Sequence, residues 1–184
     1  MPLPTHRLTI CGIPELAQHC GAGVSHVLSI IDTHEPRPSA LDGYVEVDHE
    51  LIRFDDVVAE YPGFEACTPS HIEKVLAFGE RVHLRPSGHV LVHCHAGVSR
   101  STAAAAILMA QHAPGEEEAA FLRLLKLRKH GWPNTRMVEF ADRLLGRDGA
   151  LMRGLVAYRR ALLQEKPHLS EIIRNIGRGH ELPR

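Results

Sequence analysis

The stretch that decides the fold is HVLVHCHAGVSRS, residues 89–101, followed by an alanine-rich run up to His112. Residues 89–93 form a short apolar run of the kind that makes a buried strand. Residues 94–99 contain Gly97 and predict a loop, and residues 100–112 predict a helix. A strand, loop and helix in this order point backbone N–H groups into a concavity at the helix N-terminus, where tetrahedral oxyanions bind. The stretch therefore predicts an anion site, with phosphate as the obvious guest.

The surrounding pattern alternates strands with helices in the first half of the chain. Strand signals occur at residues 8–11, 26–31, 44–47 and 51–54, and helical periods at residues 14–20, 69–84, 115–130, 137–145 and 151–163. This order predicts an α/β fold, with a central, mostly parallel sheet of about four to five strands flanked by helices. We expect one domain over residues 1–165. Residues 166–184 form a polar tail of unknown role, in which we expect one short helix around residues 170–176 and disorder beyond it.

Composition limits the classes of function. The 184 residues carry 21 Lys and Arg against 22 Asp and Glu, a net charge of −1. This balance argues against a protein that binds nucleic acid or a membrane surface, because either needs an excess of cations. The longest apolar run, residues 103–110, is too short to span a bilayer. Residues 1–7 do not resemble a secretory signal, so the cytoplasm is the expected location.

Three residues within the decisive stretch carry its chemistry. Cys94 follows the strand, under the same amides and helix dipole, an environment that lowers the pKa of a thiol and predicts a thiolate at neutral pH. Gly97 permits a tight loop and keeps Cβ atoms out of the anion bowl. Arg100 begins the helix and can donate two parallel N–H bonds to phosphoryl oxygens. Together these residues predict a thiolate beside a bound phosphoryl group.

Residues 93–101, the signature loop, resemble the pattern His-Cys-x-x-Gly-x-x-Arg-Ser/Thr of cysteine-dependent protein tyrosine phosphatases, in its dual-specificity form. A weaker resemblance extends over residues 8–146, and the segment 144–147 is similar to small bacterial members. The resemblance implies a phosphatase that hydrolyses phosphotyrosine through a cysteinyl-phosphate intermediate, with phosphoserine and phosphothreonine left open. Its partner would be a phosphorylated protein or peptide, with no metal or cofactor. The oligomeric state is not indicated.

Roles carry over to matching positions only. Cys94 resembles the nucleophile, Arg100 the residue that holds the phosphoryl oxygens, and Ser101 the hydroxyl that assists the departing thiolate. His93 matches the residue that orders the loop and stabilises the thiolate from behind. The backbone of the loop would bind the substrate phosphate through His95, Ala96, Gly97, Val98, Ser99 and Arg100.

The resemblance also requires a general acid upstream of the signature loop to protonate the leaving oxygen. Asp55 and Asp56 are the acidic pair in the right place. We favour Asp56, because strand alternation leaves the second Asp facing the pocket. The alternative is that both residues cap the turn that follows a strand. Asn134, after Pro133, is interpreted as a helix N-cap.

Several other interpretations stay open. The histidines His89, His93 and His95 alternate along one strand beside Cys94 and could ligate zinc. Any of Cys11, Cys20 and Cys67 could act as a resolving cysteine for Cys94, although each is more typical of an inert thiol. The basic residues toward the end of the helix at residues 115–130 match the helix dipole and need no partner. The chain could also be a phosphate-reading binding module without turnover, or a phosphoinositide phosphatase.

Overall fold

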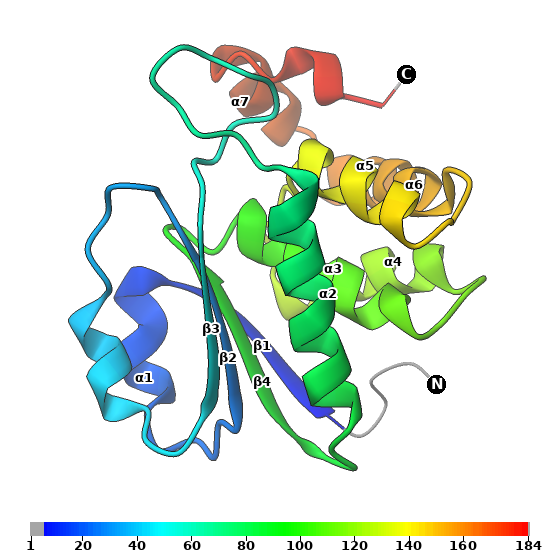
Figure 1. Cartoon of the computed structure of the whole chain (residues 1–184). Helices are drawn as coiled ribbons and strands as arrows, with labels where there is room; N and C mark the ends of the chain where they lie inside the picture. The colour runs from blue at the N-terminus through cyan, green and yellow to red at the C-terminus, as the bar shows by residue number, and fades with distance from the viewer. Residues whose placement is uncertain (1–5, 184) are drawn as a thin grey trace.

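The computed structural model describes residues 6–183. Four parallel strands form one sheet in the order β1-β4-β2-β3 (Figure 1): β1 His6–Gly12, β2 His26–Ile31, β3 Asp48–Arg53 and β4 Gly88–Cys94. The register places Gly12 beside Cys94, and Ser29 beside His93. The α/β class, the flanking helices and the expected strand number are confirmed. Because the strands are parallel, their carboxyl ends meet at one edge of the sheet.

Helices cover the two faces of the sheet unequally. Figure 1 shows the larger set on one face and the small helix α1 on the other. The larger set comprises α2 Pro69–His83, α3 Arg100–Gln111, α4 Glu117–Leu127, α5 Thr135–Leu144 and α6 Ala150–Glu165. The smaller set comprises η1 Ile13–Glu15, α1 Leu16–His19 and η2 Ser39–Gly43. The chain ends with α7 Leu169–Asn175 and η3 Gly179–Glu181.

Alternation along the strands divides the core between these faces. In β4, Val92 and Cys94 belong to the large core under α3, whereas Leu91 belongs to a small cluster on the opposite face. All twelve residues of α3 are buried, and most are small, so the helix packs closely behind the signature loop. Cys94 therefore stands between the sheet and the most buried helix of the larger set.

The strand expected at residues 44–47 is wrong. Residues 39–43 form η2 and β3 begins only at Asp48. Glu46 has a φ of 56°, which interrupts an extended backbone, and Val45 is exposed. The first half of the edge strand β3 is polar, and Arg81 of α2 forms ion pairs with Asp48 and Glu50.

The C-terminal region is more ordered than the sequence suggests. The short expected helix is α7, and η3 follows it. Ile173 of α7 is buried in the large core, against which Leu169 and Leu182 also pack. The division of the chain at residue 165 stays a prediction. Within residues 6–183, no helix has the length and apolar character needed to cross a membrane.

Candidate active site

The signature loop lies where the sequence places it, between β4 and α3. Cys94 is the last residue of β4, and Arg100 is the first residue of α3, a helix of twelve residues. The Cys94 side chain is buried, and its Sγ lies 3.2 Å from the Ser101 Oγ. His95 and Ala96 are exposed at the mouth of the loop. The thiol and the hydroxyl expected to act together are thus brought into contact.

The end of β1 supports the back of the loop. Ile13 donates a backbone hydrogen bond of 2.9 Å to the carbonyl oxygen of His95. Gly97 has a φ of +70°, as expected for a tight loop, and a Cβ there would lie 2.5 Å from the backbone of Cys11. We expected the missing Cβ of Gly97 to leave space in the anion bowl. That reason is wrong, because the missing Cβ leaves space for the backbone of β1 instead. Gly12 of β1 lies at the same contact, where an added Cβ would come within 2.9 Å of the Ala96 backbone.

Arg128 is a supporting residue that the sequence analysis missed. The helix α4 ends at Leu127, and Arg128 leaves it in an extended conformation. Its guanidinium donates to the carbonyl oxygens of Ala96 and Gly97, at 3.1 and 2.9 Å, and to both carboxylate oxygens of Glu15. The hydrogen bonds from Arg128 to the Glu15 carboxylate lower the pKa of Glu15. We expected the basic residues at the end of the helix at residues 115–130 to need no partner, and this is wrong for Arg128. Its hydrogen bonds hold the carbonyl groups of the signature loop outward.

Arg100 reaches the pocket with only part of its guanidinium engaged. Nη1 donates to the Phe54 carbonyl oxygen at 2.6 Å and forms an ion pair of 2.7 Å with Asp32. Nε is buried without a hydrogen-bond partner among the described residues. A buried donor of this kind costs free energy unless a ligand satisfies it. The Nε side of Arg100 is thus available to an oxyanion.

Asp32 was missed as a residue of the site. It follows β2 directly, and β2 is parallel to β4, so its carboxylate arrives at the same edge of the sheet as the signature loop. The position after a buried strand was the available signal, but only the strand order shows that β2 and β4 are neighbours.

The two candidate acids have different surroundings. Asp55 accepts backbone N–H bonds from Thr33 and Glu65, at 3.2 and 2.7 Å, and so ties two loops together. Asp56 accepts hydrogen bonds on Oδ1 from Ser99 Oγ at 2.7 Å and from Asn134 Nδ2 at 2.9 Å. Its Oδ2 lies 3.9 Å from Arg100 Nε. Asp56 is therefore the acid that faces the signature loop.

Asn134 makes two sets of contacts. Its Oδ1 accepts the N–H of Met137, so the expected N-cap of α5 is confirmed. Because the cap fixes the orientation of the amide, Nδ2 points toward Asp56. We define Asp56, Ser99 and Asn134 as the acid corner. The Ser99 hydroxyl donates to Asp56, and the binding of phosphate by the Ser99 backbone stays a prediction.

His93 lies on the opposite face of the sheet from Cys94. Its Nε2 is 2.6 Å from Ser29 Oγ, which in turn is 2.8 Å from His49 Nε2. Burial lowers the pKa of His93 to about 4, so the ring is neutral at physiological pH. A neutral ring joined to β2 fits the expected ordering of the loop.

The remaining histidines and cysteines form no cluster near Cys94. His89 contacts Thr9 Oγ1 and the carbonyl oxygen of Ala22, and the described residues contain no group that could hold a metal ion. Cys11 belongs to the small cluster behind the sheet, across from Cys94. Burial raises the pKa of Cys67 to about 12, which keeps it a thiol. The described cysteines are all free.

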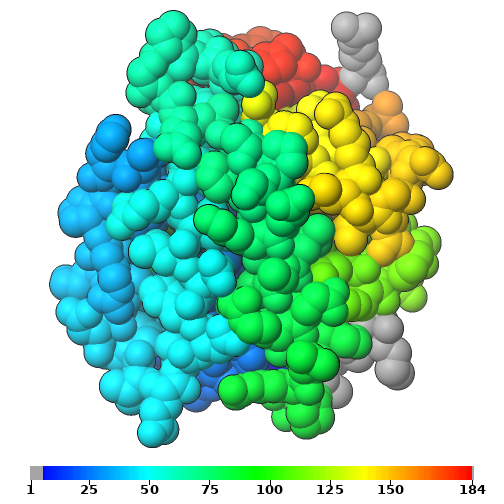
Figure 2. Space-filling model, in the orientation of Figure 1, coloured from blue at the N-terminus to red at the C-terminus, as the bar shows by residue number. Residues whose placement is uncertain are grey.

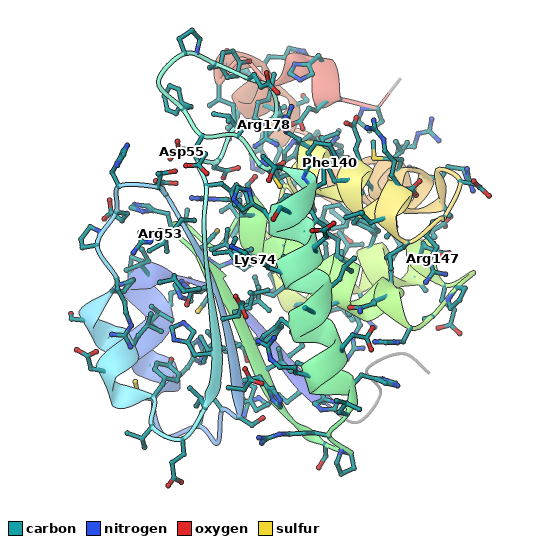
Figure 3. The ribbon with its side chains drawn as sticks, in the orientation of Figure 1. Arg53, Asp55, Lys74, Phe140, Arg147 and Arg178 are labelled. Atoms are coloured by element: carbon teal, nitrogen blue, oxygen red, sulfur yellow. The ribbon has the colours of Figure 1, made fainter. Side chains whose placement is uncertain are left out.

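These side chains surround one open pocket of about 350 Å³ at the carboxyl edge of the sheet. Its lining comprises Asp32, Asp55, Asp56, Val57, Phe64, His95, Ala96 and Arg100. Figure 3 shows Asp55 at this end of the molecule, at the top of β3. Phe64 is exposed and also lines a neighbouring groove with Tyr61 and Arg136.

Comparisons with known proteins agree with this geometry. Residues 60–133, which include the signature loop, match the family described as protein-tyrosine phosphatase. No curated protein matches this chain. Human DUSP28 superposes with a TM-score of 0.57 at 21% identity, over 76% of this chain and 94% of that chain.

Two further structures show the same fold. Tk-PTP in its active form has a TM-score of 0.53 at 19% identity, over 77% of this chain and 92% of that chain. PTPMT1 in complex with PI(5)P has a TM-score of 0.53 at 15% identity, over 80% of this chain and 94% of that chain. The narrower likeness to small bacterial members stays a prediction. Residues 60–133 thus match the protein-tyrosine phosphatase family, within a fold that is shared with dual-specificity phosphatases.

Proposed function

We propose that this enzyme hydrolyses phosphotyrosine in proteins through a cysteinyl-phosphate intermediate. The observation that carries the proposal is that Arg100 and Asp56 line one pocket with His95, the residue next to Cys94, and that the buried Arg100 Nε has no hydrogen-bond partner among the described residues. A nucleophile, an oxyanion clamp and a proton donor are the three groups that phosphoryl transfer needs. The chain supplies all three.

In the first step, the Cys94 sulfur attacks phosphorus and forms the S–P bond. The bond between phosphorus and the tyrosine oxygen breaks, and its electron pair stays on that oxygen, which takes the proton from Asp56. Loop amides and Arg100 stabilise the equatorial oxygens, where charge accumulates. The product alcohol then leaves the pocket.

In the second step, water attacks phosphorus and the S–P bond breaks. Asp56, now ionised, accepts the proton of the water. The electron pair returns to sulfur, where the Ser101 hydroxyl, 3.2 Å away, donates a hydrogen bond to the departing thiolate. Phosphate leaves and Cys94 is regenerated.

The charge of the pocket favours a substrate with one phosphate. Among the described residues that line it, Arg100 is the single lysine or arginine, while Asp32, Asp55 and Asp56 are acidic. A polyphosphoinositide would need further cations for its other phosphates. The exposed Phe64 at the rim offers an apolar contact to an aromatic side chain or its neighbours. PTPMT1 was solved with PI(5)P, and this fold neighbour keeps a phosphoinositide as the second candidate substrate.

The test compares kcat/KM for matched phosphotyrosine and phosphothreonine peptides and a soluble phosphoinositide. We expect the phosphotyrosine peptide to be turned over fastest and the inositol lipid slowest. Faster turnover of the lipid would overturn the proposed substrate class. Binding of phosphopeptides without turnover of any substrate, p-nitrophenyl phosphate included, would instead indicate a phosphate-reading binding module. A cytoplasmic location is part of the same proposal.

A further inference from the structure

The C-terminal segment, residues 166–183, folds back to the end of the molecule that carries the pocket. In Figures 1 and 2, this red segment and the loop that follows β3 occupy the same end, and Figure 3 labels Arg178 there. Ile173 is 5% exposed and joins the large core. The segment is therefore part of the folded unit next to the active site.

Glu181 is the buried charge that fixes this segment. Its side chain is 1% exposed. It accepts hydrogen bonds from Trp132 Nε1 at 2.8 Å, from Arg178 Nε at 2.6 Å and from the Thr135 hydroxyl. It also forms an ion pair of 3.1 Å with Arg159, which donates to the carbonyl oxygen of Pro133 as well. Glu181 thus joins the C-terminal segment to residues 132–135.

Residues 132–135 are in turn joined to the acid corner. The backbone N–H of Trp132 donates to Val98 O at 2.8 Å, and that of Asn134 to Ser99 O at 3.3 Å. The Asn134 side chain donates to Asp56. The position of Asp56 therefore depends on residues 132–135, which Glu181 in turn fixes through its hydrogen bonds from Trp132 and Thr135.

Arg178 makes the most direct connection. Its Nη1 donates to Ser99 Oγ at 3.4 Å, while Ser99 Oγ donates to Asp56 Oδ1 at 2.7 Å. A guanidinium accepts no hydrogen bond, so the single proton of the Ser99 hydroxyl must point to Asp56. We propose that Arg178, held by Glu181, is a positioning residue that acts through Ser99 to orient the proton donor Asp56. The inference rests on the proposed function.

The chemical consequence concerns which oxygen of Asp56 carries the proton. Oδ1 accepts two hydrogen bonds, from Ser99 and Asn134, so it serves as the carbonyl oxygen of the protonated acid. The proton then resides on Oδ2, which lies on the side of Arg100. When the P–O bond breaks, the Oδ2–H bond breaks as well, and the leaving oxygen gains that proton. Loss of Arg178 would let the Ser99 hydroxyl rotate and would loosen this orientation.

Leaving-group dependence separates positioning from a purely structural role. We would measure kcat/KM of the full chain and of Arg178→Gln with aryl phosphates that range from 2,4-dinitrophenyl phosphate to phenyl phosphate. A good leaving group needs no proton donor, whereas phenol does. We expect Arg178→Gln to lose roughly tenfold on phenyl phosphate and less than about twofold on the dinitrophenyl ester, a size typical of coupled neighbours. Arg174→Gln, an exposed arginine of α7, is the matched control and should change neither.

A double-mutant cycle with Ser99→Ala tests the route. If Arg178 acts through Ser99, Arg178→Gln should have almost no further effect in the Ser99→Ala background. Arg178→Lys, which keeps one donor, should retain most of the phenyl phosphate activity even if Arg178→Gln folds poorly. Equal loss on every ester, or the same loss with and without Ser99, would overturn the positioning role alone. A wild-type chain that hydrolyses none of the esters would overturn the proposed function and this inference with it.

Discussion

The signature loop and the acid corner share Ser99 and meet beside one pocket, but they are built in different ways. The signature loop comes from nine consecutive residues, and its geometry follows from one strand, one turn and one helix. The acid corner brings together Asp56, Ser99 and Asn134 from separate segments, and Arg178, near the end of the chain, contacts it through Ser99. A contiguous element can be read from the sequence, whereas a site assembled by tertiary contacts cannot. The difference also predicts two kinds of variant: those that slow every substrate and those that slow only substrates with poor leaving groups.

The largest effect is expected for Cys94→Ser in the signature loop. A serine hydroxyl is not ionised at neutral pH, so no phosphoenzyme forms and turnover of every ester should fall to background. Binding of inorganic phosphate, measured by calorimetry, should persist because the amides and Arg100 remain. Retention of even a tenth of the wild-type activity would show that Cys94 is not the nucleophile.

Arg100→Lys should be nearly as severe and equally independent of the leaving group. An ammonium cannot make the planar, two-pronged contact of a guanidinium, and losing one preorganised oxyanion donor costs about 10² to 10³ in kcat. Arg123→Lys, on the exposed side of α4, is the control for the exchange itself. A fully active Arg100→Lys enzyme would remove Arg100 from the phosphate-binding role.

Asp56→Asn should sharpen the contrast between the two regions. We expect kcat to fall by roughly 10² to 10⁴ with phenyl phosphate, but little with 2,4-dinitrophenyl phosphate, and the basic limb of the pH–rate profile to disappear. Asp55→Asn should do much less, because Asp55 bonds to backbone amides of its own loops. The opposite ranking of the two variants would move the proton donor to Asp55.

The smallest effect on activity at neutral pH is expected for Glu181→Gln, which should change how stability depends on acid pH. Burial raises the pKa of Glu181, but the hydrogen bond from Arg178 and the charge of Arg159 outweigh it and hold the pKa at about 2. A depressed carboxyl pKa stabilises the fold above the ordinary value of 4.5, and that contribution is lost as the pH falls toward 2. Urea unfolding of the wild type at pH 6 and pH 3 should therefore show a loss of stability that Glu181→Gln lacks. Parallel loss in both proteins would mean that Glu181 is not the group responsible.

Much of the fold was predictable because its signals are local. Apolar runs gave three of the four strands, and the Thr68-Pro69 cap gave the start of α2. The strand expected at residues 44–47 failed, because a positive φ at Glu46 is not marked by any glycine or proline. Only the second half of β3 was predicted, because its first half is polar. Asp48 and Glu50 are neutralised there by Arg81, from a helix that is distant in sequence.

The same division holds for the site. Cys94, Arg100 and Ser101 follow from a motif, and Asp56 follows from the requirement for an acid after a strand. Asp32 and Arg128 escaped notice because their partners, Arg100 and Glu15, are distant in sequence and meet only once the strand order is known. Arg178 escaped for the same reason, since nothing in a polar tail reveals a buried partner such as Glu181.

The most direct test of the account is whether phosphate resides on Cys94 during turnover. Ser101→Ala removes the hydroxyl 3.2 Å from the Cys94 sulfur, and it should slow the second step more than the first. Rapid mixing with p-nitrophenyl phosphate should then release a burst of p-nitrophenol close to one equivalent per enzyme, with acid-quenched phosphate recovered on the Cys94 peptide. No burst, together with no phosphate on that peptide, would contradict the cysteinyl-phosphate mechanism.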